Sequence, residues 1–189
     1  MNFLAHLYLS GDNDSLKIGN FIGDFVKGNQ IFDYPEDIRK GIIHHRKIDE
    51  FTDSHPVVLK SKKRLRPKYR HNAPVIVDML YDHLLARNWN NYSDLNLKYF
   101  TMNFYQIAQE KSQYLPEKAA YVLSHMSKTD WLYNYQFIEG IGRALTGMAR
   151  RTKFESKMEH ASHDLQENYQ FFEDEFVEFF DDIRDQLGH

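Results

Sequence analysis

The residues of this chain best suited to chemistry lie in the segment 41–53. Read as an α-helix, at about 100° per residue, this segment places His45, Asp49 and Asp53 within about 80° of one another. Isoleucines flank the three polar residues, so the face that carries them is also apolar. Because burying an unpaired carboxylate costs several kcal/mol, the pattern calls for a partner, which could be a basic side chain or a metal ion.

A second segment, 74–89, repeats the pattern. Asp78 and Asp82 are four residues apart on an apolar stripe, and His83 points about 100° away from Asp82. The same spacing lets His45 and Asp49 reach one ion from adjacent helical turns. Two helices that each carry such a pair predict a metal site.

Two further residues could add to that site. Asp24 lies among apolar residues with no basic partner four residues away, although Lys27 at i+3 could pair with it at the surface. His6 lies in the apolar run 2–9 and could be a further ligand or a core histidine with one hydrogen bond. Carboxylates with imidazoles favour Mn²⁺, Fe²⁺, Mg²⁺ or Zn²⁺, and an oxygen-rich set of ligands favours Mn²⁺ or Mg²⁺.

Charge is segregated along the chain, whose formal net charge is −3. The segment 60–71 holds seven of the 24 lysines and arginines and no acid, namely Lys60, Lys62, Lys63, Arg64, Arg66, Lys68 and Arg70. It could be a solvated helix face or a docking surface for an anionic partner. Nucleic acid is the weaker choice of partner, because a dedicated nucleic-acid binder is usually basic overall.

The elements that must position these residues are helices. The central helix is expected from about Glu36 to Ser54, because the residue before Pro56 disfavours the helical region. A loop is expected at 30–35, and further helices are expected at 2–9, 14–27, 74–89, 95–113, 116–127 and 154–186. Almost nothing is typical of a strand, and no repeat or linker divides the chain. The sequence therefore predicts an all-α fold, a compact helical bundle forming one domain over 1–189.

Composition narrows the function classes. The chain has no cysteine, which excludes disulfides and thiolate metal ligands and suits a reducing cytosol. It contains no apolar stretch of about 18 residues and no basic region ahead of a long apolar run. We therefore expect a soluble protein of the cytoplasm with no membrane partner. Gly140 and Gly142 do not form a phosphate loop, because they follow no strand. Arg151 could bind phosphate or favour a helix C-terminus.

The order of several short motifs resembles the acyl carrier protein phosphodiesterase family over nearly the whole chain, most tightly over residues 1–90. The matching stretches are Met-Asn-Phe-Leu-Ala-His-Leu at the start, Gly19-Asn20, Asp24-Phe25-Val26-x-Gly28, Gly41-Ile42-x-x-His45-Arg46-x-Ile48-Asp49 with Thr52-Asp53, Ala73-Pro74, Asp78, Asp82-His83-x-Leu85, and Gly147-Met148-Ala149 with Arg151. The segment after about 155 matches only loosely.

The resemblance implies an all-helical, metal-dependent enzyme similar to the HD phosphohydrolases, although the usual His-Asp pair is inverted here in Asp82-His83. Its implied reaction releases 4′-phosphopantetheine from a serine of holo-acyl carrier protein, with manganese as the usual metal. Six residues are the implied metal ligands, namely His6, Asp24, His45, Asp49, Asp78 and Asp82.

Other roles follow from the same resemblance. Asp24 is a ligand or the base that orients the attacking water, and His83 could protonate the leaving serine oxygen. Arg46 and Arg151 are candidates for holding the phosphate charge. Because acyl carrier proteins are strongly acidic, the segment 60–71 is the expected docking surface.

Two other functions remain open on the sequence alone. One is a metal-dependent phosphohydrolase of the same build that acts on a small molecule such as a nucleotide. The other is a non-enzymatic helical interaction module, in which lysines and arginines neutralise the inward carboxylates. Metal binding separates this module from the two enzymes.

Overall fold

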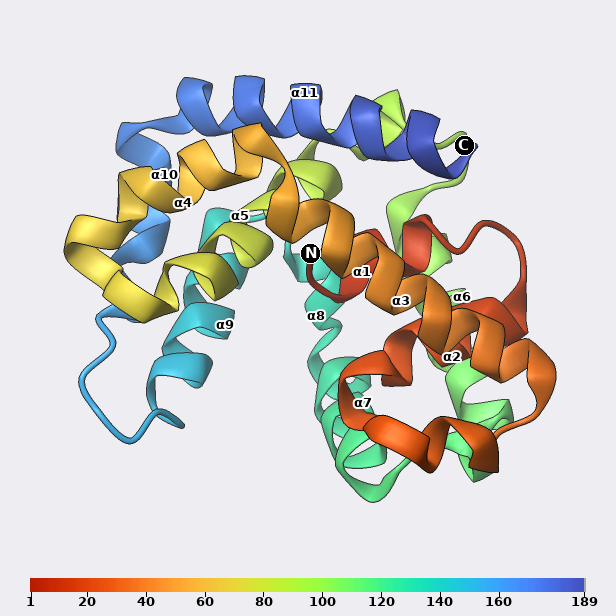
Figure 1. The fold of residues 1–189 in the computed structure, drawn as a ribbon. Helices are drawn as coiled ribbons and strands as arrows, with labels where there is room; N and C mark the ends of the chain where they lie inside the picture. The colour runs from red at the N-terminus through yellow and green to blue at the C-terminus, as the bar shows by residue number, and fades with distance from the viewer. Residues whose placement is uncertain (189) are drawn as a thin grey trace.

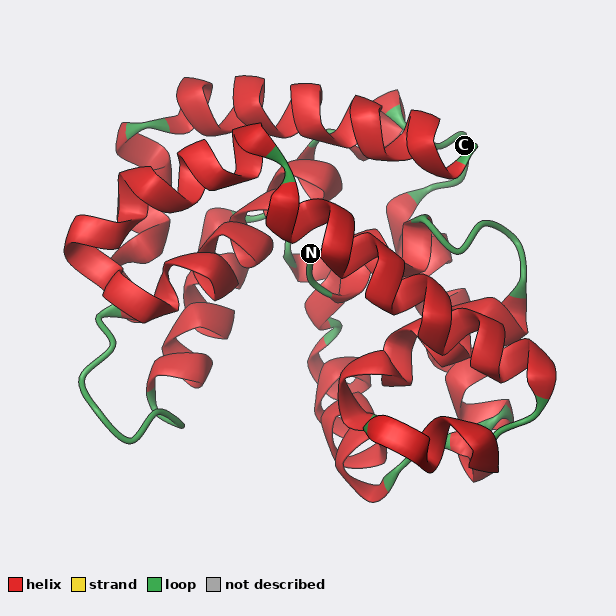
Figure 2. Cartoon of the chain, viewed as in Figure 1, coloured by secondary structure: helices red, strands yellow, loops and turns green. Residues whose placement is uncertain are grey.

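The structure, a computed structural model, describes residues 1–188, which form helices joined by short connections and contain no strand (Figures 1 and 2). The α-helices are α1 (Phe3–Tyr8), α2 (Asp14–Ile22), α3 (Glu36–Ser54), α4 (Pro56–Tyr69), α5 (Ala73–Arg87), α6 (Leu97–Glu110), α7 (Glu117–Thr129), α8 (Trp131–Asn134), α9 (Ile138–Ala149), α10 (Ala161–Glu167) and α11 (Tyr169–Leu187). Short 3₁₀ helices are η1 (Gly23–Phe25), η2 (Gly28–Asp33), η3 (Arg70–Asn72), η4 (Trp89–Asn91), η5 (Ser112–Tyr114) and η6 (Met158–His160). The all-α prediction is confirmed.

Some predicted boundaries are correct and others are not. The central helix α3 has the predicted ends, and Pro56 begins α4 because its missing N–H is tolerated in the first helical turn. The helix predicted over 14–27 ends at Ile22, where the chain tightens into η1. The single helix predicted over 154–186 is wrong. The helical chain there begins only after an irregular stretch and is broken at Asn168, which separates α10 from α11.

Helices α2 and α3 approach each other unusually closely, through a pair of glycines. A Cβ added to Gly19 would lie 2.1 Å from the carbonyl oxygen of Ile38, and one added to Gly41 would lie 2.5 Å from that of Leu16. No larger side chain fits at either position without moving the backbone. The contact brings Asn20 of α2 beside the side chain of His45 on α3.

One hydrophobic core joins the two ends of the chain. Helix α1 contacts both α2 and α5, and all of its residues from Leu4 to Leu7 are buried. Helix α11 crosses the molecule against α4 and α5 (Figure 1). It buries a stripe made of Phe172, Phe176, Phe179, Phe180 and Ile183. Each fully buried side chain of this size contributes about 1.5–3 kcal/mol of transfer free energy. No helix within residues 1–188 combines the length and apolar character needed to cross a bilayer.

Candidate metal centre

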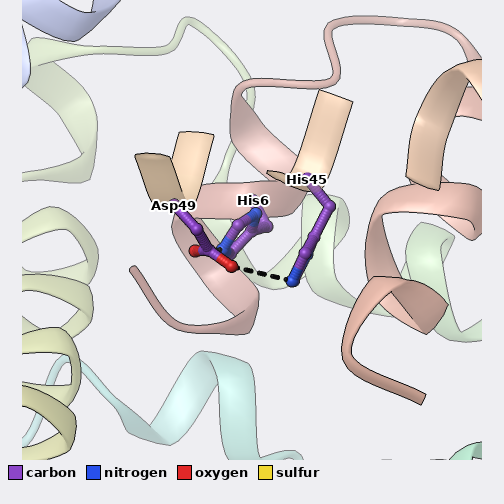
Figure 3. Close-up of side chains that lie close together, drawn as sticks. All are labelled: His6, His45 and Asp49. Atoms are coloured by element: carbon purple, nitrogen blue, oxygen red, sulfur yellow. Dashed lines mark ion pairs between the residues drawn. The ribbon is translucent and has the colours of Figure 1, made fainter. Parts of the chain in front are cut away.

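Three side chains from two helices meet at one point in the molecule (Figure 3). His6 comes from α1, whereas His45 and Asp49 come from successive turns of α3. The Nε2 atom of His6 lies 3.2 Å from Oδ1 of Asp49, and Nε2 of His45 lies 3.1 Å from Oδ2 of the same carboxylate. One ligand atom from each residue lies within 4.8 Å of the others, so the three could hold one metal ion.

A buried amide sets the orientation of both imidazoles. The Nδ2 group of Asn20 donates to the carbonyl oxygen of His6 (2.7 Å) and to Oγ of Ser10 (2.9 Å). These donations fix Oδ1 of Asn20 as the acceptor that faces the rings. Oδ1 lies 2.7 Å from Nδ1 of His6 and 3.2 Å from Nδ1 of His45. Each neutral histidine therefore carries its proton on Nδ1 and has a lone pair on Nε2.

The lone pairs of the two imidazoles and the oxygens of Asp49 consequently face one another. Nε2 of His6 is buried and makes no hydrogen bond, and the two rings are stacked with their centroids 4.1 Å apart. Acceptors directed at acceptors are unfavourable without a proton or a cation between them. A donor set of two imidazoles and a carboxylate suits Mn²⁺, Fe²⁺ or Zn²⁺. The side chains around this point therefore fit a divalent metal.

Asp24 lies on the open side of the centre. Its Oδ1 atom is 3.2 Å from Nε2 of His45, and 69% of its side chain is exposed. Gly23 makes this arrangement possible, because a Cβ at that position would lie 2.3 Å from Cγ of His45. The absence of a side chain lets η1 run directly over the imidazole and bring Asp24 to its edge.

The two histidines titrate in opposite directions. Burial lowers the pKa of His6 to about 4. Burial also lowers the pKa of His45, but hydrogen bonds and charge from Asp24 and Asp49 outweigh it and raise that pKa to about 9. Asp49 is partly buried, which raises its pKa, but its contacts with the two imidazoles hold the pKa well below the usual range. Without a metal, the centre thus holds its proton on His45 at neutral pH.

Asp78 lies beside the centre rather than within the group of three. Its Oδ1 atom is 3.3 Å from the α-amino nitrogen of Met1, which also lies 3.7 Å from Oδ1 of Asp49. Burial raises the pKa of the Asp78 carboxyl, and the nearby ammonium group opposes that rise. The ammonium group links Asp78 to Asp49, so the two carboxylates share one positive charge.

The other two residues singled out on α5 make different contacts. Both oxygens of Asp82 accept backbone N–H groups at the start of α1, from Leu4 (2.7 Å) and Ala5 (3.1 Å). Nδ1 of His83 donates to the carbonyl oxygen of Tyr135 (2.6 Å), and the ring is fully buried with its edge toward Tyr169. Asp82 therefore fixes the helix that carries His6, and His83 joins α5 to α8.

Three further residues expected at the site contact other parts of the chain. Asp53 shares a helical face with Asp49 but forms an ion pair with Lys62 at 2.7 Å, so its partner is basic. Nη2 of Arg46 donates to the carbonyl oxygen of Val26 (3.3 Å). Nε of Arg151 donates to the carbonyl oxygen of Gly147 (3.1 Å).

Most of the basic segment is neutralised within the chain. Lys60 and Arg64 pair with Glu175, and Lys68 pairs with Asp164. Lys62, which is 5% exposed, pairs with Asp53 and is not free to meet a partner. The remaining three cations are exposed and form no ion pair with a carboxylate in residues 1–188; they are Lys63, Arg66 and Arg70. The charge that the sequence offers for docking is thus reduced to these three residues.

Sequence reasoning missed the residues that orient the ligands. Asn20 and Ser10 form the hydrogen-bond network beneath the two imidazoles, and Gly23 provides the space beside His45. The sequence held one signal for the role of Asn20. This residue follows Gly19 within an apolar helical segment, where a buried side-chain amide needs hydrogen-bond partners.

Fold and site together define a class of protein: an all-helical protein in which two buried histidines and a partly exposed aspartate form a centre suited to a divalent metal. The family model described as acyl carrier protein phosphodiesterase matches residues 1–183, and the chain belongs to this family. Three relatives named acyl carrier protein phosphodiesterase are each 34% identical to it. The protein of Photorhabdus laumondii aligns with 95% of this chain and 91% of its own length. The corresponding shares are 100% and 98% for Yersinia pestis, and 95% and 94% for Enterobacter sp.. No solved structure matches the chain.

The contacts of Asp82 predict a loss of stability rather than of metal binding when it is replaced. Asp82→Ala leaves two buried N–H groups of α1 without an acceptor and should lower the free energy of unfolding by about 2–4 kcal/mol. Asp82→Asn should cost less, because its carbonyl oxygen can still accept from one amide. Denaturant unfolding of the metal-free protein measures the change.

Glu50→Ala is the matched control, since it removes an exposed carboxylate that forms no ion pair within residues 1–188, and it should cost about 0.5 kcal/mol or less. Folded Asp82→Ala should bind as many Mn²⁺ ions as the unaltered protein. Unchanged stability together with lost metal binding would make Asp82 a ligand instead.

Proposed function

We propose that this protein is a metal-dependent phosphodiesterase that hydrolyses the bond between 4′-phosphopantetheine and the serine of holo-acyl carrier protein. The products are the apo-carrier and free 4′-phosphopantetheine. The observation that carries the proposal is the pair of imidazoles that Asn20 directs at Asp49, in a chain that matches the family over 1–183. We expect the reaction to take place in the cytoplasm, with no role for nucleic acid.

The proposed metal ligands are His6, His45 and Asp49, with Asp24 at the open side as a fourth ligand or a base. Mn²⁺ is the proposed ion, because the family resemblance implies manganese and the set of imidazole nitrogens and a carboxylate can hold it. When bound, such an ion supplies a Lewis acid for the phosphoryl oxygen and lowers the pKa of a coordinated water. Asp78 would lie behind the centre and balance the charge of the Met1 ammonium group, which it shares with Asp49.

The side chains of the protein then have distinct tasks in the reaction. Asp24 is ionised in the metal-free protein, where its hydrogen bond with His45 lowers its pKa, and its exposed carboxylate can accept the proton of the attacking water. The water oxygen bonds to phosphorus, the bond from phosphorus to the serine oxygen breaks, and the serine oxygen takes up a proton. His83 is buried on the carbonyl oxygen of Tyr135, so we do not assign it as the donor of that proton.

The proposal predicts a change in the intact mass of holo-acyl carrier protein. Incubation with the protein and Mn²⁺ should lower the intact mass of the carrier by the phosphopantetheine group. Asp49→Ala and His45→Ala should each lower the rate at least about 100-fold, because each removes a ligand. Glu50→Ala is the matched control and should keep the full rate, since its carboxylate is exposed and forms no ion pair within residues 1–188.

If the mass of the carrier does not change in the presence of folded, Mn²⁺-loaded protein, the proposed reaction is wrong. Turnover of small phosphodiesters under those conditions would then favour a small-molecule phosphohydrolase. The absence of both metal binding and turnover would favour an interaction module.

Metal binding should also release a proton, and the pH dependence of this release follows from His45. Its pKa of about 9 lies above the usual 6.5, so the metal-free imidazole is protonated at pH 7.5 and must lose that proton to become a ligand. The release should approach one proton per ion at pH 7.5 and fall well below one above pH 9.5. Calorimetric titration with Mn²⁺ in buffers of different ionisation enthalpy measures it.

The raised pKa of His45 also makes the stability of the metal-free protein depend on pH. A raised folded-state pKa stabilises the metal-free protein below pH 6.5, and this contribution is lost as the pH rises through 9. His45→Gln should abolish the proton release. Full Mn²⁺ binding at pH 7.5 with no proton release would show that His45 does not exchange its proton for the ion.

We further propose that an acidic carrier protein docks on α4 and the start of η3, through the cations that have no internal partner. Lys63, Arg66 and Arg70 are exposed and carry the docking charge, whereas the other four basic residues of the segment are paired within the chain. Long-range attraction of this kind mainly raises the association rate and weakens with salt.

Reversal of these three charges tests the docking surface. A Lys63→Glu, Arg66→Glu, Arg70→Glu variant should raise KM for holo-acyl carrier protein by about 10-fold or more at low salt. Hydrolysis of bis(p-nitrophenyl) phosphate should be unchanged. The control reverses Lys111, Lys118 and Lys128, which gives the same net charge. An equal rise in KM for both variants would show that only the overall charge matters.

A further inference from the structure

An apolar cavity of about 450 Å³ lies among α1, η1, α7, α8 and α9. Its walls include the rings of Phe3, Phe25 and Trp131 and the side chain of Met148. Two arginines, Arg143 and Arg151, also line it. A volume of this size with few polar groups is typical of a small-molecule site.

Two elements, α1 and η1, supply side chains both to the cavity and to the candidate metal centre. Phe3 lies one helical turn before His6 on α1, and Phe25 directly follows Asp24 on η1. Both rings contact Phe21, with centroid distances of 5.3 Å for Phe3 and 6.3 Å for Phe25. The cavity is therefore built on the same two elements that carry His6 and Asp24, which places it as a candidate site for the part of a substrate that extends from the reacting group.

Polar groups in the cavity are few and available. Arg143 and Arg151 form no ion pair with a carboxylate in residues 1–188, and both are exposed. Asn134 donates through Nδ2 to the carbonyl oxygens of Thr129 and Asp130. Its Oδ1 atom accepts no hydrogen bond from the described residues and remains able to accept one from an amide. The lining thus offers positive charge at two points and an amide acceptor between apolar walls.

We propose that this cavity binds the pantetheine arm of the substrate, an inference that rests on the proposed function. Pantetheine carries a gem-dimethyl carbon, which suits the aromatic and methionine walls. It also carries two amides, one of which can donate to Asn134. The arginines provide charge of the sign that the phosphate requires. Because the phosphate stays with the arm when the serine oxygen leaves, the cavity retains the product side of the broken bond.

The proposed subsite gives the enzyme its selectivity for this prosthetic group. Binding of the arm holds the phosphate at the metal centre, so holo-carrier gains affinity and orientation that a short phosphodiester does not. The two substrate types should therefore respond differently when the cavity is filled.

Gly147 of α9 allows the cavity to be filled without strain on the helix. It lines the cavity, and a Cβ added there meets no atom within 4 Å. Replacing a glycine inside a helix also removes a conformational entropy cost. Gly147→Leu should therefore fold with at least the stability of the unaltered protein. Gly147→Ala, which leaves most of the volume open, is the matched control.

The kinetic test compares the two variants on two substrates. For Gly147→Leu, kcat/KM for holo-acyl carrier protein should fall by about 10-fold or more, and hydrolysis of bis(p-nitrophenyl) phosphate should stay within about twofold. Gly147→Ala should stay close to the unaltered protein on both substrates. Equal holo-carrier turnover by Gly147→Leu and Gly147→Ala would overturn the proposal.

A binding test separates this inference from the proposed reaction. Pantetheine, which lacks the phosphate, should shift the amide signals of α8 and α9 in the nuclear magnetic resonance spectrum of the metal-free protein. Gly147→Leu should abolish these shifts. If the unaltered protein fails to hydrolyse holo-carrier, the proposed function falls, and pantetheine binding that Gly147→Leu blocks would still support the cavity as its site. Absence of pantetheine binding to the unaltered protein would overturn the inference.

Discussion

The amide of Asn20 is the constraint on which the candidate site depends. It is fully buried, so every donor and acceptor must find a partner inside the protein. Its two donations, to the carbonyl oxygen of His6 and to Ser10, leave one oxygen that receives both imidazoles. Any rotation of the amide would break four contacts together. The direction of both Nε2 atoms toward Asp49 is therefore set before any ion arrives, as a supporting hydrogen-bond shell should do.

The rest of the fold brings that amide and its partners to one place. Helix α1 has only six residues, too few to be stable alone. Asp82 accepts two of its first N–H groups, and the core encloses its side chains, so α5 and α2 together hold His6 in position. The close contact at Gly19 and Gly41 then sets the distance between Asn20 and His45. The first three α-helices thereby bring His6, Asn20 and His45 together beside Asp49.

Periodicity predicted which residues share a face, but not what lies opposite that face. His45 and Asp49 were correctly placed on one side of α3 and do meet at one point. Asp53 follows the same spacing, yet a lysine of α4 neutralises it. Asp82 also fits the pattern and instead holds the start of α1. The all-α class was predictable because helical spacing is local information. The role of Asn20 depends on tertiary contacts that a single sequence does not contain.

Electrostatics decides the order in which such a site can be filled. Asp24, Asp49 and Asp78 place three carboxylates at or beside the centre, against one ammonium group and the proton on His45. A phosphodiester is itself an anion, so the metal-free centre offers it little attraction. A divalent ion that replaces the His45 proton adds one net positive charge at the point where the phosphate must lie. Under the proposed function, the metal ion must therefore bind before the substrate. Until the ion has bound, the carboxylates that hold it repel the phosphate of the substrate.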